Sequence, residues 1–518
     1  MRSSAARAYA LLFFLSGVTG LVYELLWVRV LYQAFGSTIQ SVATVVAAYM
    51  GGLGLGAWLF GRKADRHPRP ATLYGVLEIA IGAFGLISPA VLGLAHRLYI
   101  GLVGALGLGG APSVALRFGL AALVLLVPTT LMGGTLPVLT RAFMGADRSA
   151  LQRSLALLYG LNSLGAVLGT ALAGFFLIEF VGIRASLWGT AAVNLGIGVV
   201  ALRLPGSVAD PLADPEPQPG GSGVLAGSPS PLVGRVALAL LGLTAFASLL
   251  DEIAWTRVLV MVVGGSTYAF TLVLLMFLLG IGLGSAFVAC RRAVGPASAA
   301  DAGVAQGITG AGAALLLVFF AALPRYVIAV FGHPEFGALT RLVLLGVAVA
   351  AVVLIPALGM GLTFPLLTDL AARRDAARAS DVGRAYAFNT LGSIAGAVFT
   401  GFVLVAVLGT EATLRLGLVI NAAAALALAA LAARGVPEGS PEHRALRVRV
   451  LTAGSLASLT LAVAIGGPGW TTALIDLGPT IYAREPMDAA RRQAFLEHRG
   501  SRLLAFREGR NATVSVWE

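Results

Sequence analysis

Two glutamates lie deep within apolar segments of the chain, where a carboxylate is costly and therefore informative. Glu24 falls within the apolar run 8–30, and Glu252 falls within the run 236–260. A charged side chain near the middle of a bilayer costs about 2.5–3.5 kcal/mol. We therefore expect each glutamate to face the interior of a helix bundle or a wet cavity, where a carboxylate can bind a cation or take part in gating.

An arginine follows each of these glutamates at the same spacing. Arg29 and Arg257 come five positions later, which is about 140° around an α-helix, so neither can pair well with the glutamate of its own helix. Two interpretations stay open. Cross-pairs between helices, Glu24 with Arg257 or Glu252 with Arg29, could lock the outer end of the bundle, or the four residues could serve in gating or ligand binding.

A tyrosine and an asparagine occur together twice on helices rich in small residues. Tyr159 and Asn162 recur as Tyr386 and Asn389. Their side chains either form hydrogen bonds between helices or line a cavity, and the sequence leaves both interpretations open.

The remaining acids in apolar surroundings are predicted to be ordinary surface charges. Glu78 and Asp369 lie near the inner ends of apolar runs, where we expect water, and Glu179 and Glu411 are expected at loop edges. No residues have the spacing of a metal site, a nucleotide-binding loop or a catalytic triad. Residues 1–518 therefore carry no predicted metal ligand, cofactor site or catalytic residue.

The composition shows what kind of framework must hold these residues. Of the 518 residues, 58% are apolar and only 12% are charged, whereas about a quarter are charged in a typical soluble domain. The sequence thus predicts an all-α transmembrane protein whose main partner is the lipid bilayer. The net charge of +12 does not indicate nucleic-acid binding, because the basic residues are spread over short loops between apolar runs, as in membrane proteins.

Twelve apolar runs are long enough to cross a bilayer, which takes about 20 residues. They lie at 8–30, 38–60, 71–95, 116–140, 154–179, 185–203, 236–260, 267–290, 303–323, 342–370, 385–408 and 413–433. A thirteenth run, 450–467, either spans the membrane or lies on its surface. The segments counted on the N-terminal side carry 20 arginine and lysine residues, and those on the opposite side carry six. This bias predicts a cytoplasmic N-terminus in a bacterial inner membrane.

The two halves of the chain are copies of one another at an offset of 227 or 228 residues. The segment Glu24–Leu31 returns as Glu252–Leu259, and Gly52–Gly56 returns as Gly280–Gly284. Because each copy has an even number of spans, both copies enter the membrane from the same side. Such a parallel repeat of six spans is the plan of the major facilitator transporters.

The repeat divides the chain into five predicted parts. They are a first six-helix repeat (1–203), a polar cytoplasmic linker (204–234), a second six-helix repeat (235–434), a connector with the thirteenth run (435–483) and a soluble tail (484–518).

Glycines and prolines recur at matched places in the two repeats. Glycines four residues apart let helix backbones approach closely, so we favour packing over substrate contact for the pairs Gly52/Gly56, Gly165/Gly169, Gly280/Gly284 and Gly392/Gly396. Four prolines are predicted to break the fourth and tenth spans, as hinges for alternating access or as simple kinks: Pro128, Pro137, Pro356 and Pro365.

The loop predicted after the second span carries a short motif. Gly61, Asp65, Arg66 and Arg69 follow the order of the cytoplasmic loop motif of major facilitator transporters, which this loop resembles. The copy after the eighth span has lost the aspartate, so only half of the pattern is present.

The tail has the composition of a soluble domain. Residues 484–512 are rich in charge, and 506–517 read as a turn followed by an alternating strand. A lone strand has no partner for its backbone, so we expect the soluble domain to continue past Glu518.

Several of these features together resemble one family. The opening segment Phe14–Arg29, the Gly-Ser-Thr turn at 36–38 and the glycine-rich second span resemble the membrane region of bacterial fused major facilitator/spermidine synthase proteins. The segment Arg507–Val516 resembles the first strand of the spermidine synthase domain in that family. The resemblance implies a Rossmann-like aminopropyltransferase after residue 518 that binds decarboxylated S-adenosylmethionine.

Three functions follow as alternatives. The membrane region moves or senses a polyamine or related small cation, or it only anchors a synthase domain, or it is a facilitator for an unrelated small solute. The first alternative assigns the polar residues inside the bundle to a substrate, whereas the second leaves them with structural roles.

Overall fold

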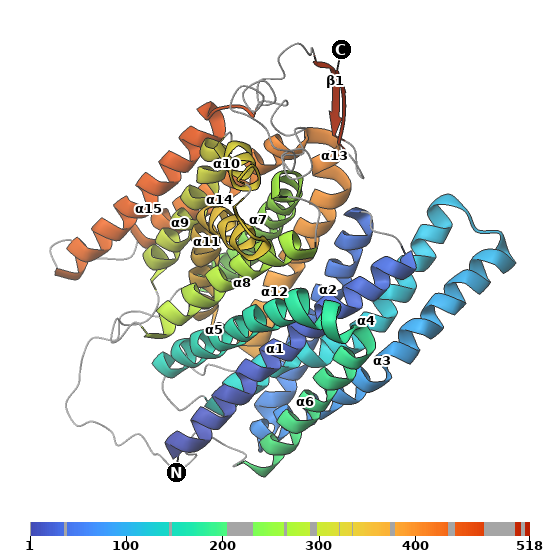
Figure 1. Ribbon diagram of the computed structural model, residues 1–518. Helices are drawn as coiled ribbons and strands as arrows, with labels where there is room; N and C mark the ends of the chain where they lie inside the picture. The colour runs from blue at the N-terminus through green and yellow to red at the C-terminus, as the bar shows by residue number, and fades with distance from the viewer. Residues whose placement is uncertain are drawn as a thin grey trace, which may run out of the picture.

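The computed structural model describes residues 2–35, 39–143, 148–204, 231–263, 267–290, 298–320, 322–333, 335–372, 379–433, 441–470, 503–508 and 513–517. Up to residue 470 the described chain is helical apart from short connections, and this confirms the predicted all-α transmembrane class (Figure 1). The predicted linker falls almost entirely outside the described residues.

The helices follow the order of the predicted spans. The first half contains α1 (Arg2–Phe35), α2 (Ile39–Arg66), α3 (Pro70–Leu106), α4 (Gly110–Phe143), α5 (Arg148–Leu172), the π-helix η1 (Ala173–Val181) and α6 (Ile183–Arg203). The second half contains α7 (Pro231–Val263), α8 (Thr267–Cys290), α9 (Ala299–Phe319), α10 (Ala322–Phe331), α11 (Ala338–Ala371), α12 (Ala379–Phe399), the π-helix η2 (Thr400–Leu404), α13 (Val405–Leu408) and α14 (Thr410–Ala433). After them come α15 (Pro441–Gly466) and the strands β1 (Leu503–Glu508) and β2 (Thr513–Trp517).

Among the described residues, 12 helices are long and apolar enough to cross a membrane. They are α1, α3 to α9, α11, α12, α14 and α15. The helix α2, which the sequence counts as a span, is not among them, and its last turns carry Arg62, Lys63 and Asp65. We nevertheless count α2 as a membrane helix, because it is 28 residues long and packs between α4 and α12.

The same helix pairs pack together in both halves. In the first half α1 packs on α5, α2 on α4 and α3 on α6, and in the second half α7 packs on α12, α8 on α11 and α9 on α14. Between the halves α2 meets α12, and its counterpart α8 meets α5. Each π-helical segment leads to a glycine with positive φ before the next long helix, at Gly182 (83°) and Gly409 (81°).

The glycine pairs pack helix against helix, as predicted. A Cβ at Gly165 would overlap the carbonyl oxygen of Phe14 on α1, and a Cβ at Gly392 would overlap that of Gly242 on α7. These two contacts occupy matching places in the two halves. None of the eight paired glycines lines the central cavity described below, so the packing interpretation is confirmed.

The four prolines do not break their helices, and this part of the prediction is wrong. Pro128 and Pro137 lie inside the continuous helix α4, and Pro356 and Pro365 lie inside α11. A proline leaves the carbonyl four residues earlier without its helical donor. For Pro365 this carbonyl belongs to Gly361, which accepts a 2.8 Å hydrogen bond from the Ser285 hydroxyl of α8. A neighbouring helix thus keeps α11 intact.

The helix α15 is one of the helices that are long and apolar enough to cross a membrane. We therefore count the thirteenth run as a span rather than a surface helix. It packs along α9 and α14. Near its start, Arg449 pairs with Asp301 in the first turn of α9 at 3.3 Å. The last turn of α15 is held by Arg415, which lies near the start of α14. The Arg415 side chain donates hydrogen bonds to the backbone carbonyls of Val463 and Ala464.

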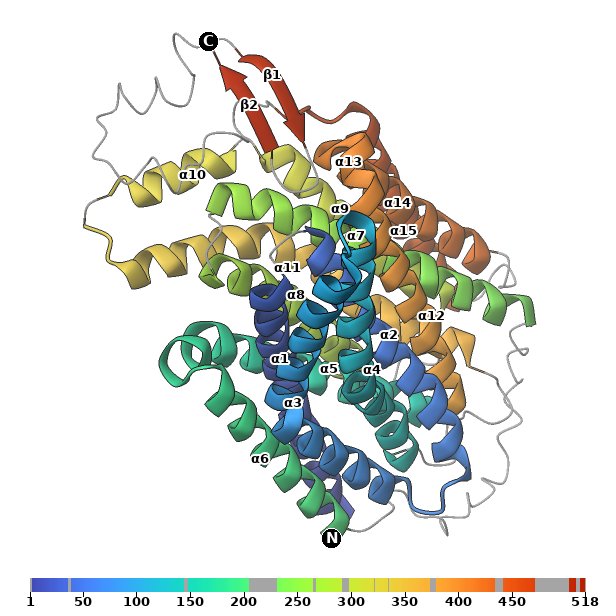
Figure 2. The same cartoon turned by 90° about the vertical axis from the view of Figure 1, so that its right-hand side faces the viewer.

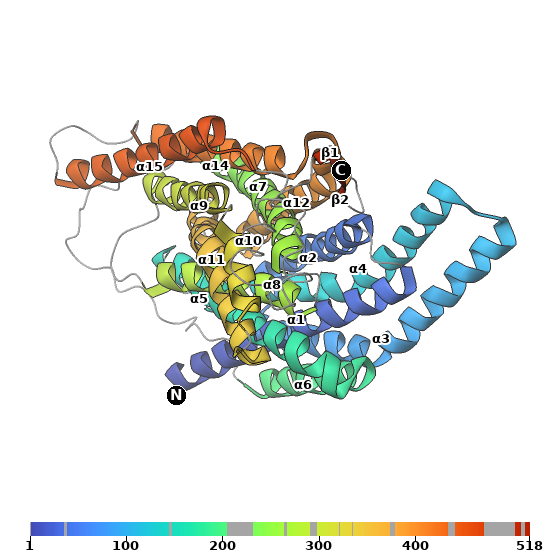
Figure 3. The same ribbon diagram turned by 45° about the horizontal axis from the view of Figure 1, so that its top comes forward.

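The crossing of α15 separates the two ends of the chain. The strands β1 and β2 pair antiparallel and lie at the end of the bundle opposite the N-terminus (Figures 1 and 2). At another edge of the molecule, the hairpin of α3 and α4 extends away from the other helices (Figure 3).

Candidate functional site

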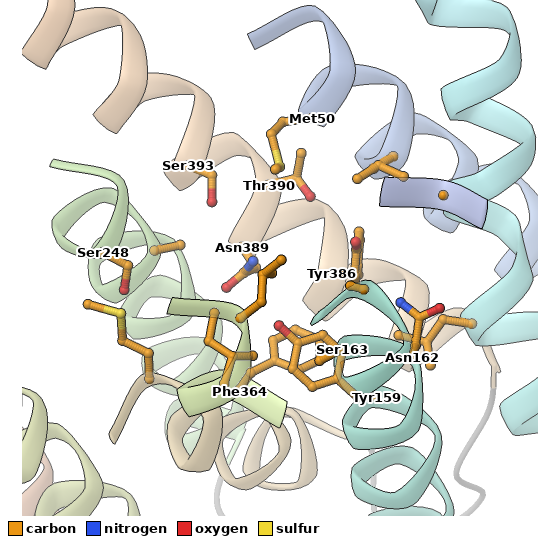
Figure 4. A pocket seen from close by; sticks show the side chains of 18 of the residues that line it. Met50, Tyr159, Asn162, Ser163, Ser248, Phe364, Tyr386, Asn389, Thr390 and Ser393 are labelled. Carbon is orange, nitrogen blue, oxygen red and sulfur yellow. The ribbon is translucent and has the colours of Figure 1, made fainter. Parts of the chain in front are cut away.

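A cavity of about 270 Å³ lies in the middle of the bundle, between the two halves. Its walls come from α1, α2, α4 and α5 of the first half and from α7, α8, α9, α11 and α12 of the second. Figure 4 shows the part of this cavity where side chains of α5 and α12 converge.

Six of the eight polar residues singled out from the sequence line this cavity. They are Glu24, Glu252, Tyr159, Asn162, Tyr386 and Asn389. The structure therefore brings both members of each repeated pair to one place, although they are more than 220 residues apart in the chain.

The two arginines lie elsewhere. Arg29 is exposed and Arg257 is partly buried, and neither lines the cavity. Among the described residues no ion pair joins Glu24 to Arg257 or Glu252 to Arg29. The interhelical ion-pair lock is therefore not observed.

The charged residue types that line the cavity are acidic. Among the described residues that line it, the carboxyl groups are those of Glu24 and Glu252, and there is no lysine, arginine or histidine. The two carboxyl groups are close enough to interact electrostatically, and Tyr49 and Tyr386 lie within the same range of Glu24. Two unneutralised carboxylates in an enclosed site repel one another unless a cation or a proton lies between them.

Aromatic side chains close one end of the cavity. The ring of Phe364 lies 4.6 Å from the ring of Tyr159 and 5.8 Å from that of Tyr386, measured between centroids. These rings pack on a hydrophobic cluster that draws residues from both halves, including Leu158 and Val382. The cluster seals the cavity toward the end at which α1, α5, α7 and α12 begin.

The opposite end of the bundle is arranged differently. There the buried residues form two clusters, one around Trp27 in the first half and one around Trp255 in the second. The halves still touch at one edge, where Phe175 stacks on Tyr268 with centroids 5.8 Å apart and the Tyr268 hydroxyl donates to Glu179. The hydrophobic seal of the cavity is thus at the N-terminal side.

The motif at the end of α2 forms part of the closed side. Gly61, Asp65 and Arg66 lie in the last turns of α2 rather than in a loop, and Arg69 is the residue before α3. The Asp65 carboxylate accepts a 3.0 Å hydrogen bond from the backbone N–H of Ser380 at the start of α12. A carboxylate is favourable at a helix N-terminus, so this contact helps to join the two halves.

The prediction that Glu78 and Asp369 are solvated is wrong. The Glu78 side chain is fully buried and Asp369 is 2% exposed. Glu411 is also more than a loop-edge charge, because it binds Arg415 and accepts from the backbone N–H of Trp470. Asp251, which no sequence pattern marks as a site residue, is also fully buried.

Comparison of the two repeats could have identified these buried acids. Glu78 aligns with Gln306, and Asp251 aligns with Tyr23, at the common offset of 228. Positions at which otherwise similar repeats differ in charge are the ones most informative about asymmetric function.

No family model matches the chain, and no curated protein matches it. The functional assignment therefore rests on the geometry and charge of the cavity.

Proposed function

We propose that this multi-pass membrane protein is a carrier for an organic cation, with a polyamine as the substrate class. The observation that supports the proposal is the cavity between the halves, where Glu24 and Glu252 are the only acidic or basic side chains among the described lining residues. A polyamine has several ammonium groups along a flexible chain, so it can satisfy two carboxylates at once.

The other groups in the cavity suit the same ligand. Tyr159, Tyr386 and Phe364 offer ring faces, which attract ammonium groups. Asn162 and Asn389 offer amide oxygens as acceptors for N–H donors. Figure 4 shows these residues gathered from α5, α11 and α12 around one space. An anionic substrate would meet only repulsion from the two glutamates.

The packing of the halves fits a carrier that works by alternating access. The hydrophobic seal lies on the N-terminal side, and the buried clusters on the other side are separate. A rocking motion of one six-helix unit against the other, as in the major facilitator plan, would exchange these two arrangements. We propose a cytoplasmic N-terminus, which places the seal on the cytoplasmic side.

Uptake of labelled putrescine and spermidine into proteoliposomes tests this function. We expect flux by the unmodified protein and a loss of at least about tenfold in Glu24→Gln or Glu252→Gln, because an ammonium group loses a charge-assisted partner. Glu335→Gln is the matched control, since Glu335 is exposed and outside the cavity. Absence of polyamine flux and binding in the unmodified protein would contradict the proposal.

The alternative is that the bundle only anchors a synthase domain, and it rests on the resemblance of the segment Arg507–Val516 to the first strand of such a domain. It makes a different prediction for the same variants. If the bundle is an anchor, replacing both cavity glutamates should leave the aminopropyltransferase activity of a longer chain unchanged, and no polyamine should cross the membrane.

A further inference from the structure

Among the described residues, two carboxyl groups outside the wall of the cavity are completely buried, one in each half of the bundle. In the first half it is Glu78 on α3, and in the second half it is Asp251 on α7. The two acids do not occupy matching positions of the repeat. The residue that matches Glu78 is Gln306, and the residue that matches Asp251 is Tyr23. The two acids therefore have different connections to the cavity.

Glu78 accepts hydrogen bonds from two helices. The Ser16 hydroxyl of α1 donates to Oε1 at 2.6 Å, and the Asn194 amide of α6 donates to Oε2 at 2.5 Å. The hydroxyls of Tyr74 on α3 and Tyr23 on α1 also lie close enough to the Glu78 carboxyl group to interact with it electrostatically. The two hydrogen-bond donors to Glu78 among the described residues are therefore uncharged side chains.

A buried carboxylate without a cation is costly, so Glu78 is a group that gains from carrying a proton. Ser16 supplies the route for that proton, because it both donates to Glu78 and lines the cavity. A hydroxyl can donate and accept at the same time, which is what a proton relay requires.

The described contacts of Asp251 offer no comparable route. The Asn421 amide donates to Oδ2 of Asp251 at 3.0 Å, and Asn421 in turn accepts from Gln306, which lines the cavity, at 2.6 Å. Side-chain amides hold their protons and do not pass them on. The residue that matches Ser16 is Thr244, whose hydroxyl donates to the Leu241 carbonyl of its own helix instead.

We propose that Glu78 is a proton-binding site that exchanges its proton with the cavity through Ser16, and that Asp251 does not exchange in this way. In the relay a proton from a cavity water or ammonium group binds Ser16 Oγ, and the proton that Ser16 held passes to Glu78 Oε1. The reverse transfer returns the proton to the cavity. Atoms and charge balance, since one proton enters and one leaves the hydroxyl.

Proton binding at Glu78 does not depend on the carrier function. Only the coupling of this proton to cation movement rests on the proposed carrier function, which it deepens. Release of a proton from Glu78 as an ammonium group binds at Glu24 and Glu252 would couple cation movement to the proton gradient. Proton binding at Glu78 itself can be measured without any substrate.

Infrared difference spectroscopy of the reconstituted full chain provides this measurement. We expect a carbonyl-stretch band of a protonated carboxyl that shifts in heavy water and disappears in Glu78→Gln. In Ser16→Ala the deuterium exchange of this band should slow at least about tenfold, which corresponds to about 1.4 kcal/mol in the barrier. Asp251→Asn should leave the band and its exchange rate unchanged.

The variant Glu78→Gln is compatible with the fold. The side-chain Oδ1 of Asn194 is buried and has no hydrogen-bond partner among the described residues. It can therefore accept from the new glutamine amide, as Asn421 Oδ1 accepts from Gln306 in the other half. A folded Glu78→Gln protein that keeps the full band, or unchanged exchange in Ser16→Ala, overturns the proposal.

Transport measurements separate this proposal from the carrier function. In proteoliposomes Glu78→Gln should keep polyamine exchange at equilibrium but lose accumulation driven by a pH gradient. If the unmodified protein moves no polyamine while the Glu78 band still exchanges through Ser16, the carrier function fails and the proton site stands. If polyamine moves and accumulation in Glu78→Gln still follows the pH gradient, the coupling role fails.

Discussion

A cysteine introduced at Val516, in a chain that also carries Cys290→Ala, is expected to react with a membrane-impermeant maleimide from outside intact cells. Val516 is exposed on β2. The chain reaches β2 only after α15 has crossed the bundle beside α9 and α14. With a cytoplasmic N-terminus, which the distribution of basic residues predicts, β2 therefore lies outside the cell.

The single native cysteine is the control for this experiment. Cys290 is exposed at the C-terminal end of α8, on the side where the seal of the cavity lies. We expect it to be protected in intact cells and labelled only after the membrane is permeabilised. Labelling of both cysteines from the same side would show that α15 does not cross, and the reverse pattern would show that the whole bundle is inverted.

The outcome also decides between carrier and anchor. An aminopropyltransferase uses decarboxylated S-adenosylmethionine, which is made in the cytoplasm. A tail on the outside is separated from that cofactor by the membrane, and this favours transport as the role of the bundle. A tail on the cytoplasmic side would make the anchor function the stronger candidate.

Substitution of Gly392 by alanine is expected to destabilise the protein strongly for so small a change. The new Cβ would overlap the carbonyl oxygen of Gly242, which belongs to the backbone of α7 and cannot turn aside. Overpacking of this kind costs about 1–3 kcal/mol. A lower apparent Tm in detergent, followed by the loss of monodisperse protein, would report the effect.

Two further variants make the glycine result interpretable. Gly165→Ala should cost about as much as Gly392→Ala, because its Cβ meets the Phe14 carbonyl oxygen of α1 in the matching contact of the other half. Gly196→Ala is the control, since nothing lies within 4 Å of its Cβ position on α6. Equal stability of all three variants would contradict close helix packing at both sites.

The site could be predicted from the sequence only where the repeat pointed to it. Glu24 and Glu252 stand out because each is an acid in an apolar run and each has a counterpart at the same offset. Glu78 lacks such a counterpart, and its position near the end of an apolar run predicts a solvated side chain. Whether Glu78 is buried depends on which face of α3 packs against α1 and α6. Because α3 has apolar residues on all its faces, the sequence has no periodic pattern that identifies the packed face.

The amino-acid sequence alone was sufficient for the all-α membrane class, most of the spans and the glycine contacts, because each follows from local composition or from a short repeated spacing. Two results required the packed chain. The placement of α15 beside α9 and α14 is seen in the contacts of Arg415 and Arg449, which meet partners more than 45 residues away. The difference between Glu78 and Asp251 depends on whether a hydroxyl from another helix reaches the carboxyl group. Such long-range contacts form only when helices far apart in the chain are brought together, and no local pattern encodes them.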